Sequence, residues 1–280
     1  MNHRPMAPGG DDGAGPIVAL LGSAEFEPWT EPVDRHVLSM ARPGPVAVLP
    51  TASWPDGPER FESWGVKGVA HYARMGVAAS VVPLRTRDDA FDPGLIEAIH
   101  GASLLFFSGG RPSYLASVLA ATPFWRALLD ELDAGAAYAG CSAGACVLGE
   151  MAPDSVTERL FAPRWAPGLH LLSGFVVCPH WDALDEHEPG LREFHEWQVP
   201  DDCTLLAIDE ETALVGGAKR WSVMGEGSVR LGRRGRWVRH DPGDVFVIAP
   251  IDALRPTRAA GPSLAWLPTT GSAEDAVTEG

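Results

Sequence analysis

AAYAGCSAGACVLG, residues 136–149, is the stretch that decides the fold of this chain. Small apolar residues lead into Gly140-Cys141-Ser142-Ala143-Gly144, which matches the pattern Gly-x-Ser-x-Gly, and helix-forming residues follow. This layout is typical of a nucleophile elbow, in which a strand ends, a serine occupies a strained turn and a helix begins. Glycines are needed there because the backbone passes so close to its neighbours that a Cβ atom would clash. A buried Gly/Ala-rich turn without chemistry could give the same pentapeptide, so the motif alone leaves both interpretations open.

Cys141 is a second candidate for the nucleophile, because thiols also serve at such turns. A cysteine-centred elbow would need glycine two positions before and two after the cysteine, where this sequence has Ala139 and Ala143. Ser142 is therefore the better candidate. Because the four cysteines lack CxxC spacing, all of them are predicted to be reduced thiols, and most of them are expected to be small residues of the core. These are Cys141, Cys146, Cys178 and Cys203.

The composition fits one large α/β domain, or a domain with a small appendage. The 280 residues are 45% hydrophobic, which is enough for a substantial core. No apolar run reaches the length of a membrane span, and the polar N-terminus lacks a signal-peptide pattern, which predicts a cytoplasmic protein. A net charge of −15 argues against a nucleic-acid partner, since a basic surface is the usual footprint of one. Residues 1–15 and 271–280 are expected to be disordered tails.

Uniformly apolar segments alternate with helical segments up to Ser142. The alternation predicts a mostly parallel sheet with helices on both faces. In such sheets, sites lie at the carboxyl ends of the strands. Gly22, residues 51–53 and residues 108–110 all fall there, together with Ser142. The predicted strands are 16–22, 46–50, 77–84 and 104–107, and the predicted helices are 58–76, 92–99, 113–120 and 123–134.

The second half of the chain has a different pattern. Residues 171–177 form a strand candidate, and residues 204–208 and 212–216 are predicted to be paired strands around Asp209-Glu210-Glu211. Residues 219–250 resemble a hairpin, with expected turns at Gly225, Gly227, Gly232 and Gly235. We therefore expect a single α/β domain over residues 16–250 with a C-terminal β-hairpin extension.

A serine nucleophile needs a base, and the base needs an orienting group. His180 follows the predicted strand before it, and Glu210 follows the strand at 204–208, so both are expected at the same sheet edge as Ser142. The order Ser, His, Glu differs from the Ser, acid, His order of α/β-hydrolases. Three other histidines, His36, His71 and His100, lie in helical stretches and are expected at the surface.

The polar segment after His180 raises the alternative of a metal site. Its pattern lacks HExxH spacing, because Pro189 follows His187-Glu188. A solvated, partly irregular flap is the favoured interpretation, and no metal or other cofactor is expected. The candidate ligands are His180, Asp182, Asp185, His187, Glu188 and His195.

Several segments, in this order, resemble peptidase family S51. That family contains cyanophycinases and aspartyl dipeptidases, and it shares the flavodoxin-like fold of class I glutamine amidotransferases. The resemblance covers roughly residues 16–250, and the co-occurrence of segments is more specific than any single motif. The matching segments are FSGG (107–110), GCSAGA (140–145), GLHLL (168–172) with His180, IDEETAL (208–214) and Val223-x-Gly225-x-Gly227-x-Val229.

The resemblance implies a serine peptidase that cleaves a small peptide or isopeptide-type amide through an acyl-enzyme. By position, Ser142 would be the nucleophile, His180 the general base and Glu210 its orienting acid. Backbone N–H groups of Gly110 and Ala143 would form the oxyanion hole. Three flanking residues are expected to contact the substrate: Gly109, Arg111 and Trp181.

The chain departs from its relatives where they recognise substrate. Cyanophycinase-like members usually carry Asp-Gln-His-Phe followed by closely spaced arginines, whereas Cys178-Pro179-His180-Trp181 is followed here by acidic residues and Arg192 alone. Cyanophycin and β-Asp-Arg dipeptides are therefore disfavoured, and neutral or basic substrates are expected. A non-peptidase amide or ester hydrolase and a catalytically silent binding protein remain alternatives. The oligomeric state stays open, a homodimer included.

Overall fold

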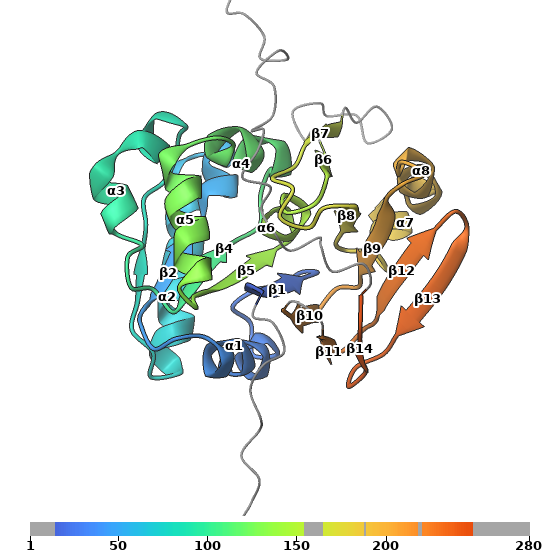
Figure 1. The fold of residues 1–280 in the computed structure, drawn as a ribbon, viewed down its shortest axis with the longest axis horizontal. Helices are drawn as coiled ribbons and strands as arrows, with labels where there is room; N and C mark the ends of the chain where they lie inside the picture. Colours follow the sequence, from blue (N-terminus) through green and yellow to red (C-terminus); the bar gives the residue numbers. More distant parts are fainter. Residues whose placement is uncertain (1–14, 154–164, 188, 218–219, 249–280) are drawn as a thin grey trace, which may run out of the picture.

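The computed structural model describes residues 15–153, 165–187, 189–217 and 220–248 as two β-sheets with packed helices (Figure 1). The expected tails, apart from residue 15, lie outside the described residues. The first half of the chain builds most of the larger sheet, and the second half builds the smaller one. In the described ranges, no helix is long and apolar enough to cross a membrane.

The larger sheet has eight strands in the order β14-β11-β10-β1-β5-β4-β2-β3. Strands β1, β5, β4, β2 and β3 run parallel to one another, and β10, β11 and β14 extend the sheet by antiparallel pairing. The predicted α/β class with a mostly parallel central sheet is confirmed. The strands are β1 Ile17–Leu21, β2 Val46–Leu49, β3 Ala79–Val81, β4 Leu104–Phe107, β5 Ala137–Cys141, β10 Thr212–Gly216, β11 Trp221–Gly225 and β14 Val245–Phe246.

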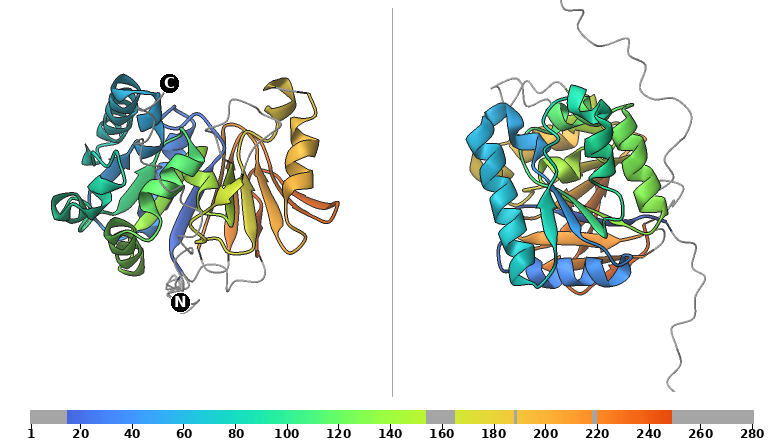
Figure 2. Two further views of the ribbon diagram at one scale, coloured as in Figure 1. Left: turned by 90° about the horizontal axis from the view of Figure 1, so that it is seen from above. Right: turned by 90° about the vertical axis from the view of Figure 1, so that its left-hand side faces the viewer.

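Helices cover both faces of this sheet, as the sequence predicts (Figure 2). Successive side chains of a strand point to opposite faces, so each strand contributes to two cores. In β1, Ala19 and Leu21 pack with α1 and α2, while Val18 and Leu20 pack in the core that contains α4 and α5. The helical segments are α1 Thr30–Met40, η1 Thr51–Asp56, α2 Pro58–Arg74, η2 Asp88–Phe91, α3 Pro93–Glu97, α4 Pro112–Leu119, α5 Pro123–Asp133 and α6 Ala143–Cys146.

The smaller sheet has four strands in the order β13-β12-β9-β8. One face contributes Val177, Leu206 and Ile208 to the core of the larger sheet, and the other face packs against α7 and α8. The two sheets therefore share one hydrophobic core. The elements are β8 Phe175–Cys178, α7 Leu184–His187, α8 Leu191–Gln198, β9 Thr204–Ile208, β12 Val229–Arg233 and β13 Arg236–His240, with a separate pair β6 Met151–Pro153 and β7 Trp165–Pro167.

Strands β9 and β10 are not partners, so the predicted pairing of residues 204–208 with 212–216 is wrong. β9 pairs with β8 and β12 in the smaller sheet, whereas β10 pairs with β1 and β11 in the larger one. Residues 209–211 thus connect two sheets instead of turning a hairpin. Gly232 is also not a turn: it lies inside β12, where a Cβ would stand 2.6 Å from the Trp237 ring. The turn of the β12–β13 hairpin contains Gly235, whose φ is 72°.

His71 is buried, so its expected surface position is wrong. Only 2% of the residue is exposed, because it lies on the inward face of α2. Its Nε2 lies 2.8 Å from Asp34 Oδ2 of α1, and the Tyr72 hydroxyl donates to Asp34 Oδ1 at 3.0 Å. Burial of this histidine is tolerated because a carboxylate partner satisfies it.

Candidate active site

Ser142 occupies the turn between β5 and α6. Its backbone has φ 50° and ψ −107°, an unfavourable conformation for a residue with a side chain. A Cβ at Gly140 would lie 2.2 Å from the Gly144 carbonyl oxygen, and one at Gly144 would lie 2.4 Å from the Phe107 carbonyl oxygen. Both glycines of the pentapeptide are thus needed for the close approach of backbone segments. The local geometry is that of a strained turn that presents a serine at the carboxyl edge of the sheet.

His180 lies between Ser142 and Glu210. His180 Nε2 is 2.9 Å from Ser142 Oγ, and His180 Nδ1 is 3.0 Å from Glu210 Oε1. His180 follows β8 with φ 55°, and Glu210 follows β9, so the smaller sheet supplies both groups. Side-chain exposures of 31% for His180 and 42% for Glu210 leave the cluster partly open to solvent. In this arrangement the imidazole can accept the serine proton while a carboxylate orients it.

Among the described residues, Glu210 is the acid of residues 209–211 that hydrogen-bonds to His180. The buried Asp209 carboxylate instead binds the Arg230 guanidinium at 2.5 Å and the N–H and hydroxyl of Ser228. The Glu211 N–H donates to the Ser23 hydroxyl at 3.1 Å. These contacts fix the loop on both sides of Glu210.

Two further contacts tie the histidine segment to the acid segment, and neither was expected from the sequence. The Glu210 N–H donates to Asp182 Oδ1 at 2.8 Å, and the Trp181 N–H donates to the Ile208 carbonyl at 3.0 Å. The sequence indicates Asp182 as a candidate metal ligand and as one of the acidic residues of the flap after His180. Its contact with the backbone depends on long-range packing that the local sequence does not specify.

Residues 109 and 110 lie next to Ser142. A Cβ at Gly109 would lie 3.8 Å from Ser142 Oγ, and a Cβ at Gly110, whose φ is 147°, would lie 2.3 Å from the Ala52 backbone. In the part of the chain that the structure describes, no acceptor binds the N–H of Gly110 or of Ala143. These two donors are available to a ligand near Ser142.

The other two residues expected at the substrate site have partners of their own. Arg111 donates hydrogen bonds from Nε and Nη2 to Asp56 Oδ1, at 2.9 and 2.7 Å. The charge of the Arg111 guanidinium is therefore paired, at the partly exposed rim of the site. Trp181 is only 3% exposed, and its ring lies 5.3 Å from that of Trp237 and beneath Arg192. Trp181 therefore packs within the smaller sheet, and its contact with substrate stays a prediction.

The cysteines are buried and unpaired, as predicted. Burial and the nearby Glu25 carboxylate raise the pKa of the Cys141 thiol well above its ordinary value. Because the thiolate is the reactive form, this shift makes Cys141 a poor nucleophile. Ser142 is the better candidate on structural grounds too.

The histidine-rich segment forms no metal cluster within the described residues. Asp185 is paired with Arg192, and His195 lies with its ring 5.6 Å from Trp165, where burial lowers the pKa of the imidazole. Glu188 lies outside the described residues.

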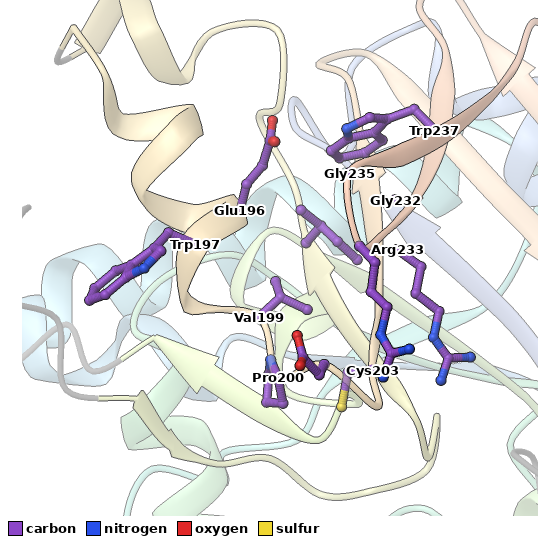
Figure 3. Close-up of a pocket in the computed structure, with 12 residues that line it drawn as sticks. Glu196, Trp197, Val199, Pro200, Cys203, Gly232, Arg233, Gly235 and Trp237 are labelled. Atoms are coloured by element: carbon purple, nitrogen blue, oxygen red, sulfur yellow. The ribbon is translucent and has the colours of Figure 1, made fainter.

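A cavity of about 250 Å³ opens elsewhere, between α8 and the β12–β13 hairpin (Figure 3). Trp237, Glu196 and Arg233 are among the residues around it, and Cys203 lies at its base. None of Ser142, His180 and Glu210 lines it, so it is separate from the site described above.

Comparison with known proteins gives a consistent assignment. The model of Peptidase family S51 matches residues 18–222. A peptidase from an acI-B1 actinobacterium is 28% identical, with a TM-score of 0.75 over 84% of this chain and 98% of that chain. A peptidase E-like protein from Listeria monocytogenes EGD-e, 17% identical, has a similar fold, with a TM-score of 0.57 over 76% of this chain and 100% of that chain. No curated protein matches the sequence. Because the family model covers most of the chain, the chain belongs to peptidase family S51 and is a serine-type peptidase.

Proposed function

We propose that this peptidase hydrolyses a small peptide or a related amide through an acyl-enzyme on Ser142. The observation that carries the proposal is the pair of hydrogen bonds that links Ser142 to His180 at 2.9 Å and His180 to Glu210 at 3.0 Å. Both distances lie within the range of about 2.6–3.2 Å at which a general base acts on its proton donor.

Each group has one task in this mechanism. Ser142 Oγ attacks the scissile carbonyl carbon while His180 Nε2 takes its proton, and the imidazolium then protonates the leaving amine. A water molecule, deprotonated by the same histidine, releases the acyl group and regenerates the serine. Glu210 holds the imidazole in the required tautomer and stabilises its positive charge.

The N–H groups of Gly110 and Ala143 are the proposed oxyanion donors. Negative charge develops on the carbonyl oxygen during attack, and backbone donors fixed in advance stabilise it without reorganisation. Support comes from their position beside Ser142 and from the lack of a competing acceptor within the described ranges.

The charges around the site favour neutral or basic substrates over acidic ones. An acidic substrate group would need a free cation nearby, and Arg111 is already paired with Asp56. Asp182 and Glu210 add negative charge near His180. The cytoplasmic location and a homodimeric state stay predictions.

A fluorophosphonate reagent tests the nucleophile directly, because it phosphonylates activated serines. We expect a single adduct on Ser142, found by peptide mapping, and none in Ser142→Ala. A dipeptide-library screen with Ser142→Ala as the blank then identifies the cleaved bond. Turnover of esters but not of amides would favour the non-peptidase alternative, and an unlabelled, folded protein would favour a catalytically silent one.

A further inference from the structure

The loop between β1 and α1, residues 22–26, contacts two loops of the proposed site, the one that carries Glu210 and the one that carries Gly110. Near one end of this loop, the Ser23 hydroxyl accepts the Glu211 N–H at 3.1 Å, next to the proposed orienting acid. Two residues further on, the Glu25 carboxylate accepts the Gly109 N–H at 2.7 Å. Residues 22–26, here called the β1–α1 brace, therefore connect the acid loop with the glycine loop.

The backbone holds Glu25 in a fixed place at a cost in strain. The residues on either side of it, Ala24 and Phe26, have φ values of 51° and 67°. The Phe26 ring is buried and lies 4.6 Å from the Phe106 ring, and the Trp29 indole N–H donates to the Ala24 carbonyl at 2.8 Å. Strained conformations of this kind persist only when the surroundings determine them, and they concentrate at functional sites.

Glu25 is a buried carboxylate whose neighbours are the Gly109 N–H and the Cys141 thiol instead of a cation. The residue is 4% exposed, and it has no ion pair within the described part of the chain. Burial of a carboxylate without a cation is costly, so its retention needs a specific reason. The mechanism given above assigns no role to this group.

The contact places Glu25 directly behind the proposed oxyanion loop. A Cβ at Gly109 would lie 3.3 Å from Glu25 Oε1 and 3.8 Å from Ser142 Oγ, so these two oxygens are at most about 7 Å apart. This hydrogen bond holds the peptide unit between Ser108 and Gly109, which directly precedes the unit that carries the Gly110 N–H. The Gly110 N–H itself has no acceptor within the described residues.

We propose that Glu25 is a positioning residue, which holds the Gly109 N–H and thereby aims the Gly110 N–H at the substrate carbonyl oxygen. The inference rests on the proposed function, since it assumes that Gly110 is an oxyanion donor. The acceptor oxygen of Glu25 carries the effect, because its negative charge by itself opposes an oxyanion nearby. Glutamine keeps an acceptor oxygen without the charge, and alanine removes both.

The test is the second-order rate constant for phosphonylation of Ser142 by a fluorophosphonate, with the melting temperature measured in parallel. We expect Glu25→Ala to label at least tenfold more slowly, because loss of an oxyanion donor costs about a hundredfold and this donor is displaced, not removed. Glu25→Gln should restore the rate to within about threefold of wild type. With p-nitrophenyl acetate, Glu25→Ala should lower kcat more than it raises KM. If Glu25→Ala does not fold, Glu25→Leu fills a similar volume without an acceptor and replaces it.

Glu131 provides a matched control at the opposite edge of the same sheet. It is also a buried carboxylate that accepts a glycine N–H, that of Gly101 at 3.1 Å before β4, but unlike Glu25 it is paired with Arg42 and His100. Glu131→Ala should lower the melting temperature and leave the labelling rate unchanged.

Three results would overturn the inference: wild-type labelling of folded Glu25→Ala, an equal loss in Glu25→Gln, or an equal loss in Glu131→Ala. The second would show that charge matters and the third that general destabilisation does. Failure of the proposed function gives a different result, since wild-type Ser142 would then remain unlabelled, and the inference would fall with it.

Discussion

Glu210→Gln isolates the electrostatic contribution of the acid to the proposed mechanism. The replacement keeps the size of the side chain and an oxygen that can accept the His180 Nδ1–H, now 3.0 Å from Oε1. What it removes is the negative charge that stabilises the imidazolium formed when Ser142 loses its proton. The expected effect is therefore a lower kcat with little change in KM.

The magnitude follows from the distance and the exposure. Two unit charges about 4 Å apart attract by about 4 kcal/mol at an effective dielectric constant of about 20 and by about 1 kcal/mol in bulk water. Because Glu210 is 42% exposed, its contribution lies between these limits, near 2 kcal/mol. At about 1.4 kcal/mol for each factor of ten, kcat should fall about 30-fold.

Steady-state hydrolysis of the best dipeptide from the library screen measures this effect, with Ser142→Ala as the blank. Glu211→Gln is the matched control, because the Glu211 side chain is exposed and, among the described residues, the backbone of Glu211 makes its hydrogen bonds to Ser23 and Glu226. The control should retain wild-type kcat. A loss below threefold in Glu210→Gln would refute the proposed electrostatic contribution of the acid, and a loss equal to that of Ser142→Ala would show that the variant disrupts the site as a whole.

Four further predictions concern the site and the fold. Ser142→Ala and His180→Ala should each lower kcat by about a thousandfold or more while circular dichroism spectra stay unchanged. Gly144→Ala should abolish fluorophosphonate labelling, because its Cβ would lie 2.4 Å from a backbone oxygen of β4; normal labelling would contradict the elbow geometry. Burial lowers the pKa of His195, so the unfolded chain binds its proton first as pH falls below about 6.5, and folding stability is lost below that pH. As the pH is lowered from 7.5 to 5.5, wild type should therefore lose stability that His195→Phe keeps, and the melting temperature of the variant should rise relative to that of wild type. Peptides with Arg or Ala at the residue that donates the scissile carbonyl should have higher kcat/KM than the peptide with Asp there. If the Asp peptide is instead cleaved best, and Arg111→Ala removes that preference, acidic peptides are the substrates.

Local sequence patterns predicted the parallel half of the fold well. Uniformly apolar runs such as β4 and β5 are buried on both faces, and helix signals such as Asp92 before Pro93 are realised, since the Asp92 carboxylate caps α3 by accepting the Gly94 N–H at 2.7 Å. The antiparallel strands were harder to place, because a strand pattern specifies which residues are buried but not which strand they join. Residues 204–208 and 212–216 show this, since each pairs in a different sheet.

The candidate site residues that directly follow strands could also be predicted, because an apolar run shows where a buried strand ends. Ser142, His180 and Glu210 each follow an apolar run, and parallel strands of one sheet bring their carboxyl ends to one edge. The expectation that all three share a single sheet edge is wrong, however, because His180 and Glu210 follow strands of the smaller sheet and Ser142 follows a strand of the larger one. Glu25 also follows such a run, three residues after Gly22, yet an isolated glutamate in a loop has no signature of its own. Its contact with Gly109 depends on a strained backbone that only the folded chain specifies.

The smaller sheet belongs to the proposed catalytic site, because it supplies His180 and Glu210. Residues in unfavourable backbone conformations lie in the loops of the proposed site, including Ser142, His180 and Glu211, and each such conformation costs on the order of 1–3 kcal/mol. Such strain persists only where neighbouring structure is rigid. The connection between the sheets supplies that rigidity, because the buried Asp209 is bound by Arg230 of β12 while the Glu211 N–H is bound by the β1–α1 brace. A mutation that loosens β12, far along the chain from Ser142, should therefore disturb the position of the proposed acid before it disturbs the nucleophile.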